Sequence, residues 1–250
     1  MMLKMQKNSL SAHFNELKLR IIYTLILFFL CFFVAYHYSE QIYKFLLLPL
    51  TENWFSEDKH MIYTNLSEIF FSYLKLAYYA ALFVTLPFFV CQIYIFIAPG
   101  LYKHEKRALL PFLILSPILF FLGVVFVYYV IFPLAWAFFL SFEQNMIVNL
   151  PIRLEAKVSE YLTLVISMML AFGMAFQMPI ILALLAKLDI ITAETLKEKR
   201  RFAIVLIFVL AAILTPPDAV SQIGLAIPML ILYELSILVC VKINKGQKNA

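Results

Sequence analysis

Two glutamates stand among basic residues at positions where apolar helices would meet water. Glu16 lies in the stretch SAHFNELKLR, directly before a long apolar run, and Glu105 lies in IAPGLYKHEKR, after a Pro-Gly pair that interrupts helix formation. Their basic neighbours are Lys4, Lys7, Lys18 and Arg20 for the first acid, and Lys103, Lys106 and Arg107 for the second. Nearby cations keep a carboxylate ionised. Two ionised carboxylates on one face of a membrane would be able to receive a cationic ligand.

Each acid also has a simpler interpretation. Glu105 can be a solvated loop charge that lowers local repulsion, and such a charge contributes little free energy. Glu16 can be a first-turn acid that the helix dipole favours. The residues alone leave these alternatives open.

Motifs of enzyme chemistry are missing from the sequence. KHEKR is not a zinc-protease H-E-x-x-H motif, because no second histidine follows four residues on. There is no glycine-rich phosphate loop and no G-x-S-x-G nucleophile turn. The four histidines fall on at least two sides of the predicted membrane domain, so they cannot form one metal cluster: His13, His37, His60 and His104. We therefore expect neither an enzyme nor a bound metal or cofactor.

The composition predicts an all-α integral membrane protein. Of the 250 residues, 64% are hydrophobic and only 14% are charged, whereas ordinary soluble domains are about 45–50% apolar. One membrane domain over residues 1–250 accounts for the whole length. A spanning helix needs about 20 mostly apolar residues, and six segments qualify or nearly qualify: 21–38, 67–98, 108–135, 159–186, 202–216 and 220–241.

Two of these six segments need interpretation. The uncharged run 108–142 is too long for one span, so we expect a tilted helix that ends near Pro133 and an apolar interfacial segment after it. The fifth segment offers few uncharged residues before Pro216 and Pro217. A re-entrant segment or a thin span would both fit this length, and we choose a short final hairpin of two thin spans.

Lysine and arginine in the loops set the orientation of a membrane protein. With the N-terminus in the cytoplasm, fifteen basic residues lie on the cytoplasmic side and four on the far side. This asymmetry predicts six spans with both termini in the cytoplasm.

Three polar residues inside the predicted spans need partners, because an unpaired polar group in lipid is costly: Lys75, Gln177 and Glu234. The spacing of seven between Glu68 and Lys75 places both on one helix face, which favours an inward polar stripe. Gln177 can bind another chain, or it can satisfy the kinked backbone near Pro179. A small secondary transporter that uses Lys75, Gln177 and Glu234 is therefore an alternative function, although transporters usually show internal repeats and none is visible here.

Six stretches of the sequence resemble motifs of the TatC family, the receptor subunits of the twin-arginine protein translocase. HFNELKLR looks like the opening motif of the family and FIAPGLYKHEKR like its first cytoplasmic loop. The other four follow in the family's order: FVYYVIFPLA, SEYLTLVISMMLAFGMAFQMP, LTPPD and LAIPMLILYE. The order and the membrane depth of all six make this a specific resemblance over nearly the whole chain.

The resemblance implies a receptor that binds signal peptides with two adjacent arginines and starts the export of folded proteins. The acids at the positions of Glu16 and Glu105 would contact the arginine pair. The same binding region would include His13, Leu17, Arg20 and Phe96. Pro49, Tyr128 and Asp218 match family positions on the far-side face, and Gln177 matches a polar site where the single-span partners TatA and TatB are thought to bind. Lys18 departs from the family pattern, which has arginine there.

The resemblance also implies an architecture and a setting. The expected fold is a curved, open bundle of six helices shaped like a cupped hand, in a heteromeric complex that also contains further copies of this chain. Transport would use the proton-motive force without nucleotide or any cofactor. The expected location is the bacterial inner membrane, with an organelle inner membrane as the alternative, and nucleic acid is not expected as a partner.

Overall fold

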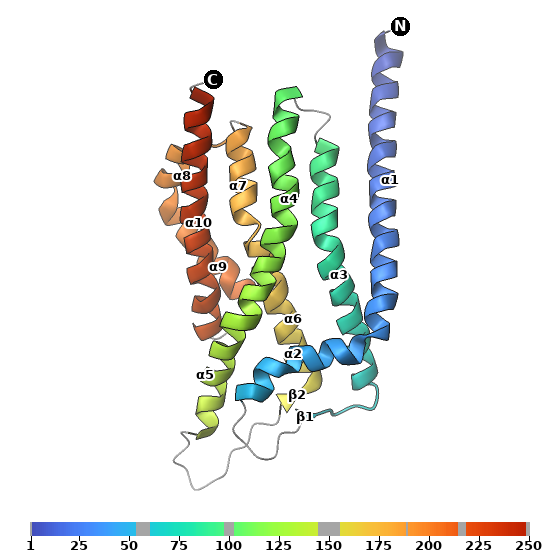
Figure 1. The fold of residues 1–250 in the computed structure, drawn as a ribbon, viewed down its shortest axis with the longest axis vertical. Helices are drawn as coiled ribbons and strands as arrows, with labels where there is room; N and C mark the ends of the chain where they lie inside the picture. The colour runs from blue at the N-terminus through green and yellow to red at the C-terminus, as the bar shows by residue number, and fades with distance from the viewer. Residues whose placement is uncertain are drawn as a thin grey trace.

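Helices make up nearly all of the protein (Figure 1). The computed structural model describes the backbone of residues 2–53, 61–97, 103–144, 156–188, 190–214 and 219–248. Side chains are described for the same residues except 2–14, 53, 97, 103–110, 142–144, 214, 219–221 and 245–248. The helices are α1 (Met2–His37), α2 (Ser39–Asn53), α3 (Glu68–Ile97), α4 (Lys103–Phe126), α5 (Phe132–Gln144), α6 (Val158–Ala175), α7 (Met178–Lys187), α8 (Ala193–Glu198), α9 (Arg200–Leu214) and α10 (Ala219–Lys248).

Five helical segments in the described part of the chain are long and apolar enough to cross a membrane. They are Asn15–His37, Glu68–Phe96, Pro111–Ser141, Val158–Lys187 and Gln222–Asn244. The remaining predicted span corresponds to α9, which has 15 residues and is therefore about 22 Å long. Because this length is below that of the hydrocarbon core, a sixth span at α9 stays a prediction.

The prediction that the third span ends near Pro133 is wrong. Helical backbone continues from α4 through a π-helical segment (η2, Val127–Ile131) into α5, which ends at Gln144. The Phe132 N–H donates to the Val127 carbonyl five residues back, and Pro133 has no N–H to donate. The wider π turn lets the chain pass the proline without ending the helix.

The fourth predicted span contains a break next to Pro179. Helix α6 ends at Ala175 and α7 begins at Met178, with Pro179 in the first turn of α7. Proline is well tolerated at this position because its missing N–H would be unpaired in any case. The break leaves Gln177 between the two helices, so the expected kink near Pro179 is confirmed.

Helix α2 is an element that the sequence analysis did not predict. It crosses the end of the molecule opposite to the start of α1 and the end of α10 (Figure 1). Its own residues Leu46 and Leu50 are buried against the rest of the molecule. Tyr128 and Tyr161 each donate a hydrogen bond to a backbone carbonyl of α2, at Phe45 (2.7 Å) and Leu46 (2.6 Å). These two bonds attach α2 to η2 and to α6 (Val158–Ala175).

Two short strands lie near α2 and pair in parallel: β1 (Met61–Ile62) and β2 (Ala156–Lys157). They join the segments that precede α3 and α6. The starts of these two helices are therefore held together at the same end of the molecule (Figure 1).

Helices α4 and α6 pack closely against each other at two glycines. A Cβ at Gly123 would lie 2.6 Å from the Phe172 carbonyl oxygen, and a Cβ at Gly173 would lie 2.7 Å from the Phe120 ring. Phe120 and Phe172 are themselves fully buried. Small residues allow helices in membranes to approach closely, and here they set the separation of α4 and α6.

Candidate functional site

Glu16 and Arg20 form an ion pair one helical turn apart on α1. Residues four apart lie on the same helix face, and the Arg20 Nη2 and Nε atoms donate to Glu16 Oε1 at 2.6 Å and 3.2 Å. The Glu16 side chain is 38% exposed and the Arg20 side chain 19% exposed. The carboxylate thus holds a guanidinium while it still reaches the surface.

Arg20 also connects α1 to α3. Its Nη1 donates to Gln92 Oε1 at 2.7 Å. The guanidinium therefore lies between a carboxylate of one helix and an amide oxygen of another. Sequence reasoning did not identify Gln92, because only the packing of α1 against α3 brings residues so far apart in sequence together.

The other predicted binding residues lie at the same end of the molecule, but side chains are described for only two of them. Phe96 follows Gln92 by one turn of α3 and is half-buried, and Leu17 is half-buried on α1. His13 is part of α1 and Glu105 belongs to the first turn of α4, but their side chains lie outside the described residues.

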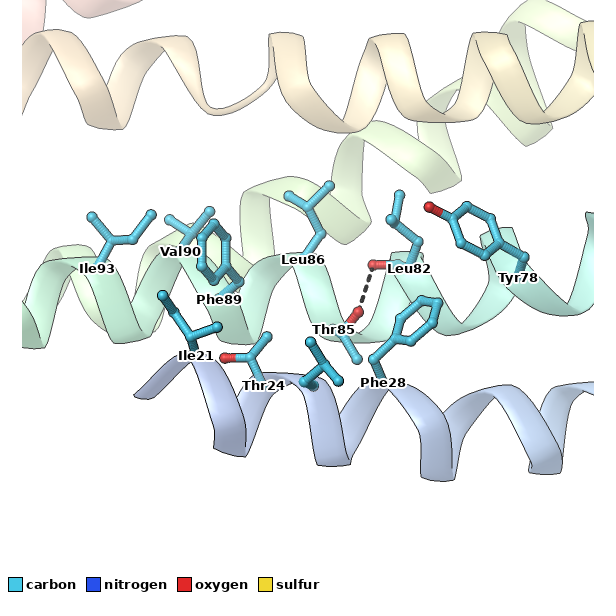
Figure 2. Close-up of a pocket in the computed structure, with 11 residues that line it drawn as sticks. Ile21, Thr24, Phe28, Tyr78, Leu82, Thr85, Leu86, Phe89, Val90 and Ile93 are labelled. Atoms are coloured by element: carbon cyan, nitrogen blue, oxygen red, sulfur yellow. Dashed lines mark hydrogen bonds between the residues drawn. The ribbon is translucent and has the colours of Figure 1, made fainter. Parts of the chain in front are cut away.

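An apolar groove between α1 and α3 begins directly beside this ion pair. It has a volume of about 620 Å³, and its lining starts at Ile21 and Ile93, the residues next to Arg20 and Gln92. Figure 2 shows Thr24 and Phe28 of α1 pointing toward α3, and Thr85 of α3 pointing toward α1. The threonine hydroxyls donate to backbone carbonyls of their own helices. The groove therefore presents an apolar surface along both helices.

Helix α1 is the least enclosed of the five membrane-spanning segments. Only 6% of the most apolar stretch of α1 is buried inside the protein, whereas 56% of the corresponding stretch is buried in the segment that contains α6 and α7. Most of the surface of α1 is thus available to lipid or to a bound partner.

Glu68 and Lys75 of α3 both contact α6, Glu68 at a buried position and Lys75 at a partly exposed one. Glu68 accepts hydrogen bonds from the hydroxyls of Ser159 (2.7 Å) and Thr64 (3.2 Å) and from the Thr64 N–H (2.9 Å). Lys75 donates to the Thr163 hydroxyl at 2.7 Å. Because Ser159 and Thr163 are four apart on α6, the stripe of α3 meets a matching stripe of α6.

Glu234 belongs to a different part of the molecule. Its carboxylate pairs with Arg200, the first residue of α9, at 2.8 Å, and both side chains are about half exposed. Within the described part of the chain, the side chains of Lys75, Gln177 and Glu234 form hydrogen bonds with three different residues on three different helices. These contacts do not connect the three residues into one path.

Gln177 is bound inside this chain. It is buried, its Oε1 accepts from the Ser116 hydroxyl at 2.6 Å, and its Nε2 donates to the Ser116 carbonyl at 2.9 Å. Its amide therefore joins the α6–α7 break to α4. A contact between Gln177 and a partner protein stays a prediction.

Two of the three far-side positions lie together at α2. Pro49 is buried within α2, and Tyr128 stacks on Phe45 with ring centroids 4.6 Å apart. Asp218 lies outside the described residues. Tyr161, which sequence reasoning missed, makes the second hydrogen bond to α2.

The five long apolar helical segments define a multi-pass membrane protein. Comparison with known proteins gives its family. The family model of TatC, the Sec-independent protein translocase protein, matches residues 12–228. The chain belongs to the TatC family.

Individual relatives match over nearly the whole length. The TatC protein of Rickettsia prowazekii is 48% identical over 237 residues, which cover 94% of each chain. The TatC protein of Escherichia coli is 34% identical over 228 residues, covering 91% of this chain and 86% of that protein. A crystal structure described as the twin arginine translocase receptor TatC superposes with a TM-score of 0.79 at 34% identity, covering 91% of this chain and 99% of that one. The all-α membrane fold expected from the sequence is thereby confirmed.

Proposed function

We propose that this protein is the signal-peptide receptor of a twin-arginine translocase. It binds peptides that carry two adjacent arginines, with Glu16 and Glu105 as the carboxylates, and starts the export of folded proteins. The contact between Glu16 and the Arg20 guanidinium carries the proposal. It supports the proposal because the partly exposed Glu16 carboxylate pairs with a guanidinium of this chain, the same chemical group that an arginine signal would bring.

Arginine is the ligand that such a site favours over lysine. A guanidinium is planar and can make two parallel hydrogen bonds with a carboxylate, whereas an ammonium is a point charge. The surrounding basic residues repel cationic peptides that lack the right geometry, which adds to specificity. His13, Leu17 and Phe96 would complete the binding region.

The apolar groove supports the same proposal. Secretory signal peptides carry a basic segment followed by 7–15 apolar residues, which as a helix would be about 10–22 Å long. Residues 78–93 of α3, which line the groove from Tyr78 to Ile93, extend about 22 Å. A peptide whose arginines bind near Glu16 could therefore place its apolar segment along α1 and α3.

The proposal includes partners and a location. The protein would act in the bacterial inner membrane with both termini in the cytoplasm, together with TatA- and TatB-type single-span proteins and further copies of itself. The starts of α1 and α4 and the ends of α3 and α10 lie at one end of the molecule (Figure 1), which supports a common side for them. Transport would be driven by the proton-motive force.

Export of a folded reporter tests the proposal. The reporter carries an Arg-Arg signal peptide, and the cells lack their own TatC but produce matching TatA and TatB proteins. We expect this chain to restore export, and Glu16→Ala or Glu105→Ala to abolish it while the variant protein still accumulates in the membrane. Export that persists in both variants at normal protein level would contradict the assigned binding residues.

A further inference from the structure

The Arg20 guanidinium is held along two of its edges by two different helices. Nε and Nη2 donate to Glu16 Oε1 on α1, and Nη1 donates to Gln92 Oε1 on α3 at 2.7 Å. Hydrogen bonds from a charged donor are about twice as strong as those between neutral groups. The Gln92 contact therefore fixes the plane of the guanidinium rather than only its distance from α1.

An exposed ion pair between two residues one turn apart on a single helix is an ordinary contact. Such exposed pairs contribute little and exchange among several side-chain geometries. The contact with α3 restricts Arg20, which is only 19% exposed. Because Arg20 donates two hydrogen bonds to Glu16, the restricted guanidinium also restricts the orientation of the carboxylate.

Orientation of a carboxylate matters more for binding arginine than for binding lysine. Two parallel hydrogen bonds to a guanidinium need a fixed carboxylate plane, whereas the attraction of an ammonium depends mainly on distance. We propose that Gln92 is a specificity-determining residue that positions Glu16 through Arg20 and so produces the preference for Arg-Arg over Lys-Lys signal peptides. This inference rests on the proposed function of Glu16 as a peptide-binding residue.

The test compares Arg-Arg and Lys-Lys versions of one signal peptide on the purified protein in lipid nanodiscs. Gln92→Met keeps the length of the side chain and removes the acceptor. We expect the affinity ratio of Arg-Arg to Lys-Lys to fall about tenfold, mainly through weaker Arg-Arg binding. Gln92→Glu keeps an acceptor for Arg20 and should retain the ratio, although its added charge strengthens the binding of both peptides.

A matched control separates this role from a general one. Gln222→Met makes the same change on α10, where Gln222 bonds to the Phe208 carbonyl at 3.3 Å, and should leave the ratio unchanged. If Gln92 only tied α1 to α3, Gln92→Met would weaken both peptides equally and the ratio would stay constant. That result would overturn the inference, as would loss of the ratio in Gln92→Glu.

Two further results keep the inference testable. If Gln92→Met does not fold, Gln92→Asn, which draws the acceptor back by one methylene, should lower the ratio in part, and an unchanged ratio would overturn the inference. Different results would contradict the proposed function and the role of Gln92. An unaltered protein without any Arg-Arg preference would contradict the function, whereas a preference that survives in Gln92→Met would contradict only the role of Gln92.

Discussion

Gln177 and Ser116 exchange two hydrogen bonds across the interface between α4 and the α6–α7 break. Ser116 is fully buried and Gln177 nearly so. Gln177→Leu should therefore lower the free energy of unfolding by about 1–2 kcal/mol, because the buried hydroxyl and carbonyl of Ser116 each lose a hydrogen-bond partner. Thermal unfolding in detergent would measure the loss.

The same pair separates a structural role of Gln177 from a partner role. Ser116→Ala removes one bond to Gln177 but keeps the amide. If Gln177 also contacts a TatB-type protein, Gln177→Leu should reduce co-purification of that protein much more than Ser116→Ala does, with peptide binding intact in both. Equal co-purification from the two variants would remove the partner role.

Glycines at the α4–α6 interface should tolerate no side chain. Gly123→Ala places a methyl group 2.6 Å from a backbone oxygen, and Gly173→Ala places one 2.7 Å from the buried Phe120 ring. We expect each to cost about 1–3 kcal/mol of stability, with the larger cost at Gly123 because a backbone oxygen cannot rotate away. Gly224→Ala is the control, since the nearest atom would be 3.9 Å away. Its melting temperature should not fall, because alanine without a clash is favoured over glycine inside a helix.

The attachment of α2 should depend on two tyrosine hydroxyls. Tyr128→Phe and Tyr161→Phe each remove one hydrogen bond to a carbonyl of α2, at a cost of about 1 kcal/mol. The double variant should make residues 39–53 easier to cleave in limited proteolysis. Tyr129→Phe is the control, because Tyr129 is 67% exposed, and it should be cleaved no faster than the unaltered protein. Cleavage of Tyr129→Phe as fast as that of the double variant would show that loss of the two hydroxyl bonds is not the cause of the faster proteolysis.

Glu68 should contribute more to stability than Glu40 does. Its carboxylate receives donors from both Thr64 and Ser159, so Glu68→Gln turns an amide N–H₂ toward groups that are themselves donors. We expect a lower melting temperature than that of Ser159→Ala, which removes only part of this set. Glu40→Gln, which breaks an exposed pair with Lys44, should leave the melting temperature unchanged, and a matching loss there would contradict the account.

Much of the membrane architecture could be predicted from long apolar runs and from the positions of basic residues. The second predicted span, 67–98, corresponds to α3, because a run that long forms a helix in lipid regardless of its partners. The helix end near Pro133 was predicted wrongly because proline usually interrupts a helix, and only the backbone reveals the π turn that accommodates it. Helix α2 was missed although Ile42, Leu46 and Leu50 recur at helical spacing, since it is too short to read as a span.

The site was predictable where it depends on one helix and not where it depends on two. The pairing of Glu16 with Arg20 follows from their spacing of four, and so does the alignment of Glu68 with Lys75 from their spacing of seven. Gln92, Ser159 and Thr163 complete these contacts from other helices. No local pattern in the sequence marks them, because their roles arise from the packing of helices far apart in the chain.

Peptide binding to the purified protein is the measurement that tests the central claim most directly. One signal peptide would be offered with Arg-Arg and with Lys-Lys to the unaltered protein, to Glu16→Gln and to Glu105→Gln. We predict a preference for Arg-Arg of roughly ten- to hundredfold, as expected for charge-assisted hydrogen bonds, and its loss in either variant. Equal binding of the two peptides to the unaltered protein would contradict the assignment of these carboxylates as the arginine receptor.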